Sequence, residues 1–422
     1  MKTESNKKKA FLWNTASGLI NAGQSAVILI FISHLLTKND VGIFTIAYAL
    51  GNLFSTMGKY GVRNFQVTDI NEQYSFREYF NSRTLSSVGV MLLMIVYILF
   101  QLCTGKYTLI KSMTIVLICL WKMIDTAEDV FYGMYQQQGR LDVGARCYTI
   151  RLTISTVLFC LLLMFKTPLF VTSMTVLVVS IVSSLFIIMY TAPRFRQSHE
   201  IKNYMPSLSA ADKELLKACF PLFLGTSLSI FVGNAPKYLI DWYLDDSTQA
   251  IFGYIMMPAF VIMVLNQFIY QPIIRDLGEL WSSGRLNAFV RRVLKQYLIV
   301  GGITAVVIVA GVIVGIPILS VMYNTDLSAF RPEFAIILLG GGFYAIVSFI
   351  MVPLTAMRNQ NVISYGFIAA SILSLVLGRA LILWKGVMGA SVLYCLLNLI
   401  LAMIFTFCFI LFVNKRRREM NE

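Results

Sequence analysis

Residues 293–319 read VLKQYLIVGGITAVVIVAGVIVGIPIL, an apolar stretch in which Lys295 is the one charged residue. A helix needs about 20 apolar residues to cross the hydrocarbon core of a bilayer. Helices and closed barrels alone satisfy their backbone groups there. Stretches of this kind, each about 18 to 27 residues long, follow one another along almost the whole chain. We therefore predict about twelve transmembrane helices, near 11–36, 41–58, 84–103, 113–136, 147–165, 169–190, 219–242, 249–272, 293–319, 332–356, 362–384 and 387–413.

Most Lys and Arg residues fall in every second gap between these stretches. Loops rich in Lys and Arg stay in the cytosol, so the alternation predicts that both termini are cytosolic. One span more or fewer would place the basic gaps that follow it on the opposite side of the membrane, and the alternation would be lost. The gaps predicted to lie outside hold few cations, namely Lys38, Lys106, Lys111, Lys166, Arg331 and Lys385.

The composition excludes a soluble protein. Hydrophobic residues make up 57% of the chain, charged residues 13%, and the mean hydropathy is +0.72. The net charge of +14 is interpreted as positive-inside charge and not as a nucleic-acid surface. The cysteines lie in or beside apolar stretches and the two histidines, His34 and His199, are far apart, so we predict no metal and no cofactor. The outer gaps are too short for a catalytic loop, and we predict that the protein is not an enzyme.

The loop at 191–217, with Pro193 and Pro206, divides the spans six and six. The sequence entering the second span, Leu36 to Phe44, is echoed by Leu244 to Phe252 before the eighth. Halves with an even number of spans share one orientation and enclose a cleft between them. The predicted fold class is therefore an all-α polytopic membrane protein with two six-helix bundles, 1–200 and 201–422, around a central cleft.

Polar residues inside two equivalent spans lie at steps of three and four, and therefore on one helical face. These residues are Asn14, Ser17, Asn21, Gln24 and Ser25 in the first span, and Ser227, Asn234, Lys237 and Asp241 in the seventh. Packing between helices explains such a face as well. Because both equivalent spans carry it, we favour the wall of a hydrated cleft.

The fourth span contains WKMIDTAED at 121–129, with Lys122, Asp125 and Asp129 on one face and Glu128 beside them. A charge near the bilayer centre costs about 3 kcal/mol or more unless it is paired or hydrated. The face either looks into a hydrated cleft, which we favour, or buries an ion pair between Lys122 and Asp125. The acids could also hold a cation or a proton.

Two cytosolic segments add further cations. Lys59 and Arg63, after the second span, either obey the positive-inside bias or belong to a site. Aromatic and basic residues in the next segment predict a short amphipathic helix on the membrane surface, formed by Phe76, Arg77, Tyr79, Phe80 and Arg83.

Short motifs follow one another in order along the chain: Leu36-Thr37 with Asp40-Val41-Gly42-Ile43-Phe44, then Gly58, Gly61 and Arg63, then Gln138-Gly139-Arg140, and finally Gly386-Val387-Met388-Gly389-Ala390-Ser391. In this order they resemble the multidrug/oligosaccharidyl-lipid/polysaccharide exporter superfamily, and within it the polysaccharide-unit flippases.

The resemblance implies transport of an undecaprenyl-diphosphate-linked oligosaccharide from the inner to the outer leaflet of a bacterial cytoplasmic membrane, by alternating access and for surface polysaccharide synthesis. It also implies membrane lipids, and glycosyltransferases and a polymerase of the same pathway, as partners. A diphosphate needs cationic groups. The residues expected to serve are Lys122, Lys237, Arg63 and Lys59 for the diphosphate, Asn14, Asn21, Gln24 and Asn234 for the sugar, and Asp125, Glu128, Asp129 and Asp241 as charge partners or as sites of H⁺ or Na⁺ coupling.

An exporter of organic cations with the same fold is the alternative function. Such a pump would use the acids of the fourth span, with Lys122 acting against them.

Overall fold

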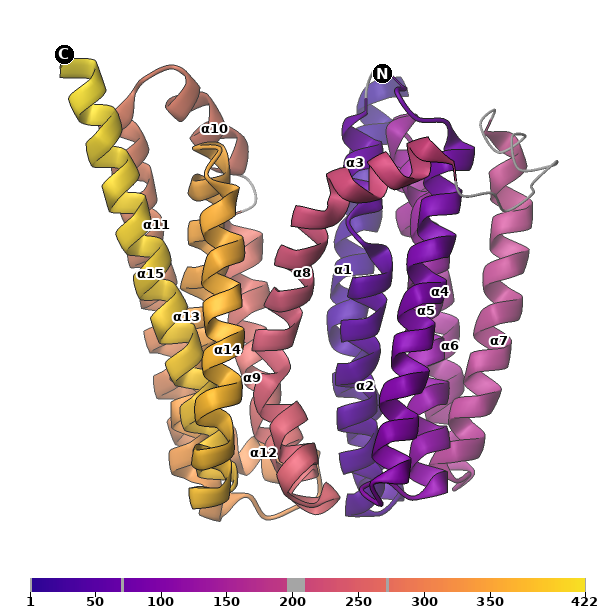
Figure 1. The fold of residues 1–422 in the computed structure, drawn as a ribbon. Coiled ribbons are helices and arrows are strands. Elements are labelled where there is room, and N and C mark those ends of the chain that lie inside the picture. Colours follow the sequence, from indigo (N-terminus) through magenta and orange to yellow (C-terminus); the bar gives the residue numbers. More distant parts are fainter. Residues whose placement is uncertain (1, 70–71, 196–208, 271–272, 422) are drawn as a thin grey trace. The chain divides into compact units, whose positions relative to one another are not determined.

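The computed structural model describes residues 2–69, 72–195, 209–270 and 273–421, and these residues form helices without a β-strand (Figure 1). They separate into two compact units, Met1–Ile230 and Phe231–Glu422. The division falls inside a helix, whereas the boundary predicted from the sequence lies at residues 200 and 201, outside the described residues.

The first unit contains α1 (Lys2–Leu35), α2 (Lys38–Lys59), α3 (Val62–Thr68), α4 (Phe76–Cys103), α5 (Leu109–Gln137), α6 (Leu141–Met164), α7 (Leu169–Thr191) and the 3₁₀ turn η1 (Ala192–Arg194). The first part of α8 (Ala210–Tyr243) also belongs to it. Helix α5 contacts α2, α4, α6 and α7 and is the central element of this unit.

The second unit contains the rest of α8, α9 (Asp246–Tyr270), α10 (Ile274–Ser282), α11 (Leu286–Ala310), the π-helical segment η4 (Gly311–Gly315), α12 (Ile316–Met322), η5 (Ser328–Phe330), α13 (Arg331–Ala356), α14 (Gln360–Lys385) and α15 (Val387–Asn421). Helix α13 contacts α9, α11, α14 and α15 and is central here.

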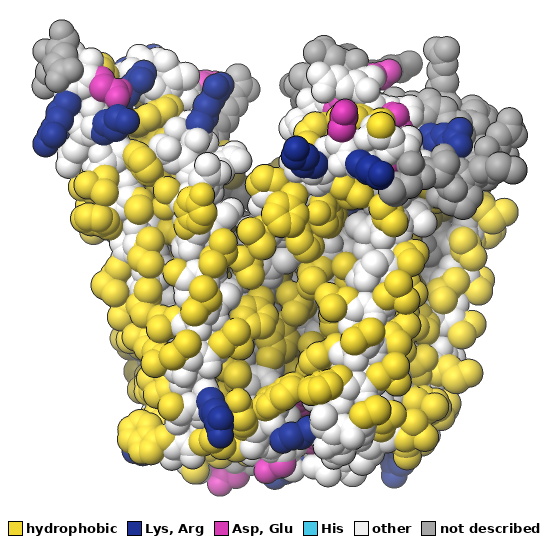
Figure 2. All heavy atoms as spheres, viewed as in Figure 1, with side chains coloured by type: hydrophobic (Ala, Val, Ile, Leu, Met, Phe, Trp, Pro, Cys, Tyr) yellow, Lys and Arg dark blue, Asp and Glu magenta, His cyan; other side chains and the backbone are white. Residues whose placement is uncertain are grey.

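Every predicted span coincides with a long helix, and the stretch 293–319 coincides with the continuous run α11–η4–α12. Among the described residues, ten helices are long and apolar enough to cross a membrane. Helix α5 is long enough but carries more charge, from the cluster around Lys122. Large apolar side chains such as Leu298 and Phe186 are 78% and 71% exposed. Figure 2 shows such side chains along the helices, with Lys and Arg gathered near the helix ends. These surfaces face lipid, because proteins in water rarely expose contiguous apolar surfaces of this extent.

The prediction of a surface helix over residues 76–83 is wrong. These residues are the first turns of α4, which continues to Cys103. Phe76 and Tyr79 are buried in a core cluster with Tyr135, together with Leu215 from α8. Their aromatic and basic pattern therefore reflects packing inside the first unit and not contact with the membrane surface.

The entry to α4 is fixed by local hydrogen bonds. Ser75 caps the helix in a reciprocal pair with Glu78, whose carboxylate accepts from the Ser75 N–H at 2.7 Å. The Asp69 carboxylate accepts from the N–H groups of Gln73 and Tyr74 and from the Tyr79 hydroxyl. Burial raises the pKa of Asp69, but these hydrogen bonds to the charged form outweigh it, and the net pKa is lowered.

Candidate functional site: a buried charge cluster on α5

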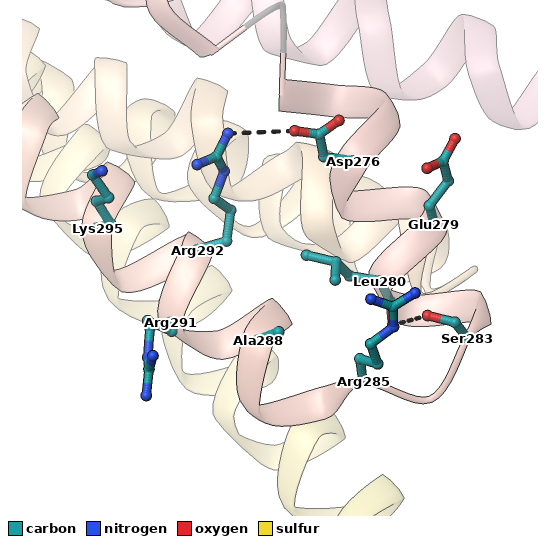
Figure 3. A pocket seen from close by; sticks show the side chains of 9 residues that line it. All are labelled: Asp276, Glu279, Leu280, Ser283, Arg285, Ala288, Arg291, Arg292 and Lys295. Atoms are coloured by element: carbon teal, nitrogen blue, oxygen red, sulfur yellow. Dashed lines mark hydrogen bonds and ion pairs between the residues drawn. The ribbon is translucent and has the colours of Figure 1, made fainter.

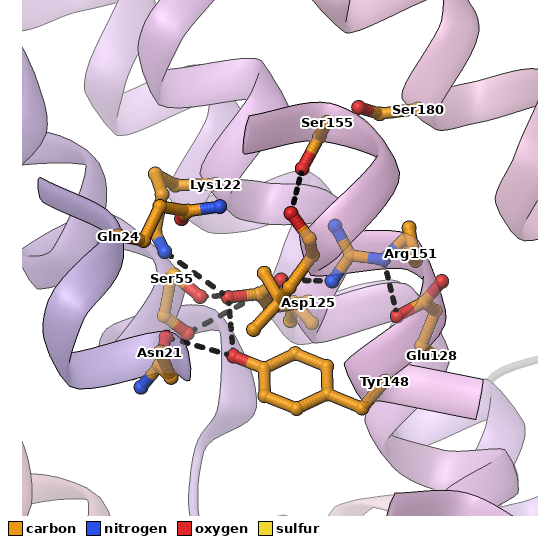
Figure 4. A network of polar contacts seen from close by, with 12 residues as sticks. Asn21, Gln24, Ser55, Lys122, Asp125, Glu128, Tyr148, Arg151, Ser155 and Ser180 are labelled. Carbon is orange, nitrogen blue, oxygen red and sulfur yellow. Dashed lines mark hydrogen bonds and ion pairs between the residues drawn. The ribbon is translucent and has the colours of Figure 1, made fainter. Parts of the chain in front are cut away.

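The carboxylate of Asp125 is shared by two cations inside the first unit. Arg151 of α6 donates to it through Nη2, and the Lys122 ammonium lies 3.5 Å from its other oxygen. The Arg151 Nε also donates to Glu128 at 2.8 Å. Arg151 and Glu128 are 1% and 0% exposed, so the interaction is fully desolvated (Figure 4). Arg151 thus ties α6 to two consecutive acidic positions of α5.

Asp129, one turn further along α5, is held by a second pair of cations. Arg83 of α4 donates to it at 2.7 Å and Arg63 of α3 at 3.1 Å. Arg63 uses its other terminal nitrogen to donate to Gln136 at 2.8 Å. Arg83 is 2% exposed, whereas Arg63 is 29% exposed. The cluster therefore runs from a sealed interior at Lys122 to a partly open end at Arg63.

Polar residues of α1 extend the cluster. Asn21 accepts a hydrogen bond from the Tyr148 hydroxyl at 3.0 Å, and the same hydroxyl lies 3.3 Å from Asp125. Gln24 donates to Thr156 at 2.8 Å and accepts from Tyr48 at 3.2 Å. These contacts connect α1 with α2 and α6, as Figure 4 shows for Asn21 and Tyr148.

Lys122 lies close against α2. Its ammonium is 3.4 Å from the Tyr48 hydroxyl and 4.8 Å from the centre of the Tyr48 ring. A Cβ atom on Gly51 would meet the Cγ of Lys122 at 2.9 Å. The glycine is therefore required for the close approach of α2 to the stem of Lys122.

Cations outnumber acids in this cluster. Lys122, Arg151, Arg83 and Arg63 oppose the carboxylates of Asp125, Glu128 and Asp129. Lys59, half-buried at the end of α2, adds a further positive charge near Asp125 and Asp129. The cluster is therefore cationic overall, and each of its three acids is already paired.

The structure thus shows the buried ion pair between Lys122 and Asp125 that the sequence left as the alternative to a hydrated cleft. Lys122 is 3% exposed. Asn21, which is exposed, and Gln24, which is buried, contact this cluster through Tyr148 and Tyr48. Asn14 is exposed and its backbone carbonyl accepts from Ser17.

The remaining predicted site residues belong to the part of α8 in the second unit. Lys237 is 6% exposed, and its ammonium lies 5.3 Å from the centre of the Phe260 ring. Among the residues that the structure describes, no carboxylate forms an ion pair with Lys237. Asp241 is buried, Asn234 is half-buried, and both have interaction partners. A buried cation without a counter-ion is costly and is a candidate for function.

Neither Arg83 nor Arg151 is among the site residues predicted from the sequence, and Arg83 is predicted there to belong to a membrane-surface helix. The signal that could have found them is the set of three acids on one face of α5. Buried carboxylates require cationic partners. Arginines near the starts of the neighbouring spans are therefore the candidates for these ion pairs.

The fold defines the class of protein. It is similar to a multidrug resistance MATE family transporter of the MOP superfamily in an inward-facing conformation, with a TM-score of 0.70 and 12% identity over 94% of this chain and 96% of that one. It is equally similar to the lipid II flippase MurJ in an inward closed conformation, with a TM-score of 0.69 and 15% identity over 96% and 90% of the two chains. The chain therefore has the polytopic, all-helical membrane fold of these two proteins.

The sequence then gives the family. The profile described as "Polysaccharide biosynthesis protein" matches residues 8–277, more than half of the chain, and the chain belongs to this family. It is also 23% identical over 350 residues to the capsular polysaccharide biosynthesis protein CapF of Staphylococcus aureus, covering 82% of this chain and 84% of that one. The resemblance drawn from the short motifs is confirmed.

Proposed function

We propose that the protein carries an undecaprenyl-diphosphate-linked oligosaccharide from the inner to the outer leaflet of a bacterial cytoplasmic membrane, for surface polysaccharide synthesis. Membership in the polysaccharide biosynthesis family and the transporter fold support a flippase role. Both termini would be cytosolic, and the glycosyltransferases and polymerase of the pathway would act before and after it. The two units would move against each other in alternating access.

The observation that carries this proposal is the excess of cations in the α5 cluster. A diphosphate brings about two negative charges, which arginine and lysine bind through charge-assisted hydrogen bonds. Arg63 and Lys59 are partly exposed, so the headgroup would meet them first and would compete with Asp129 for Arg63. Lys122 and Lys237 are buried in this structure, so they would bind the diphosphate in another conformation that exposes their side chains. Asn14, Asn21, Gln24 and Asn234 would contact the sugar.

The rival function, export of an organic cation, is not favoured by the α5 cluster, because its three acids are already paired. Such a substrate needs a carboxylate, and Asp125, Glu128 and Asp129 are each bound by arginine. For coupling by H⁺ or Na⁺, Glu128 is the most suitable of these acids. One of its carboxylate oxygens is buried without a hydrogen-bond partner among the described residues.

A transport assay in proteoliposomes tests the proposal. A fluorescent saccharide on a polyprenyl diphosphate is placed in both leaflets, and a membrane-impermeant quencher reports the rate at which inner-leaflet probe becomes accessible. We expect the purified protein to accelerate this step over empty liposomes. The matched variant Arg140→Gln removes an exposed cation, 48% accessible and paired with Asp142, and should keep the rate. No acceleration of the lipid probe, together with transport of ethidium by the same liposomes, would favour the organic-cation exporter.

A further inference from the structure

A second cationic site lies in the second unit, where α10 turns into α11. A cavity of about 570 Å³ opens there. Its lining includes four cations, Arg285, Arg291, Arg292 and Lys295, and two acids, Asp276 and Glu279 (Figure 3). The positive-inside bias accounts for basic residues at this end of a helix, and all four of these residues line the same hollow.

The acids neutralise only part of this charge. Asp276 accepts from Arg292 at 3.3 Å, and Figure 3 shows these two side chains turned towards each other. No carboxylate in the described part of the chain forms an ion pair with Arg285, Arg291 or Lys295. Arg291 and Lys295 are both exposed. The site therefore has cations available for an anion from outside the protein.

The wall formed by α10 is anchored to the bundle. Leu277 is 0% exposed, and the Trp281 ring packs on Phe289 at a centroid distance of 5.3 Å. Phe289 in turn lies 6.0 Å from Phe409 of α15. From α15, Arg416 is placed over Trp281 at 5.8 Å. The hollow is therefore formed by packed elements and belongs to the folded unit.

The helical register of α11 indicates which anion fits. Arg291, Leu294, Lys295 and Leu298 are spaced by three, four and seven residues and share one face. Leu294 and Leu298 are 57% and 78% exposed, on a helix run that is apolar enough to cross a membrane. A phospholipid could therefore place its phosphate at Arg291 and Lys295 while its acyl chains lie along Leu294 and Leu298. A soluble phosphate would use the cations but not the leucines.

We propose that the hollow between α10 and α11 binds the phosphate of an anionic phospholipid, with Arg291 and Lys295 as the main ligands. This lipid is distinct from the transported substrate, and its site does not depend on the α5 cluster. Basic residues close to an anionic membrane surface each strengthen lipid binding about fivefold.

The test measures binding of phosphatidylglycerol to the purified full-length protein in detergent micelles by native mass spectrometry, with phosphatidylcholine as the neutral lipid. We expect phosphatidylglycerol to be retained in preference. The double variant Arg291→Gln/Lys295→Gln should weaken its affinity by about thirty-fold. The control Lys166→Gln/Lys385→Gln removes the same charge from two other exposed positions and should change little.

Equal affinity in the double variant and the unmodified protein would overturn the site. So would an equal loss in the control, because it would mean that net charge alone is responsible. A third arm adds inorganic phosphate as a competitor. Displacement of the lipid by inorganic phosphate at a similar concentration would show a site for soluble anions and refute the assignment to a lipid. Monodisperse elution of each variant confirms that the altered residues have not unfolded the protein.

Discussion

Arg83 of α4 and Asp129 of α5 form a buried ion pair at 2.7 Å, and the same guanidinium donates to the carbonyl of Gly58 in α2 at 3.3 Å. One side chain therefore links three helices of the first unit. A desolvated charge of this kind is stable only while its partner is present.

Arg83→Gln is expected to destabilise the first unit by about 1–3 kcal/mol, because Asp129 keeps Arg63 as a counter-ion while the buried hydrogen bonds of Arg83 to Asp129 and Gly58 are lost. Thermal unfolding in detergent, followed by fluorescence-detected size exclusion, measures the change. Arg140→Gln breaks an exposed pair as a control and should cost at most about 1 kcal/mol. Equal stability of the two variants would contradict a structural role for Arg83.

Lys122→Gln is expected to stop flipping of the lipid-diphosphate probe while the protein remains folded. Asp125 keeps Arg151 as its counter-ion, so the loss of Lys122 does not leave a carboxylate alone. The proteoliposome assay and the melting temperature give the two readouts. An unchanged flipping rate would remove Lys122 from the proposed headgroup site.

Lys237→Met should behave differently, because Lys237 is buried over Phe260 without an ion-paired carboxylate among the described residues. Removing a desolvated cation relieves a cost, so we expect equal or higher thermal stability together with lost transport. Phe260→Leu, which removes the aromatic ring and leaves the cation, serves as the comparison. Lys237→Met with full transport would show that the residue is dispensable.

Asp69 should contribute stability above about pH 4 and lose it in acid. Its pKa in the folded protein is lowered below the ordinary value of 3.8, so the folded state favours the carboxylate. The contribution is complete above the unfolded value and disappears as the pH falls through the lowered folded value. Melting temperatures of the unmodified protein and Asp69→Asn are compared from pH 7 to pH 3. The gap between them should be largest at pH 7 and narrow in acid, and a constant gap would contradict the assignment.

Gly389→Ala is expected to destabilise the second unit strongly. An added Cβ would meet the carbonyl oxygen of Leu381 at 1.9 Å, and backbone at that distance has to move. At Gly89, an added Cβ has no heavy atom within 4 Å. Gly89→Ala should therefore leave the stability unchanged or raise it by up to about 1 kcal/mol, because alanine favours a helix interior. Yields of folded protein and melting temperatures distinguish the two.

The positions of the long helices could be predicted from hydropathy, because the lipid solvent imposes a length of about 20 apolar residues on each span. The polar faces of α1 and α5 followed from helical spacing. Arg83 was wrongly assigned to a surface helix, because the aromatic residues around it pack equally well on a membrane or on Tyr135 and Leu215. Neighbouring sequence does not distinguish these two apolar environments.

The sequence by itself determined which segments are apolar helices, where the charges fall along them, and which family the motifs resemble, because these properties depend on composition and local periodicity. The tertiary structure alone decided which charges meet. Arg151 and Arg83 come from different helices to bind acids on α5. Arg291 and Lys295, which line the hollow beside α10, instead form no ion pair with a described acid. Pairing between distant helices depends on how whole faces pack, and no local pattern encodes that contact.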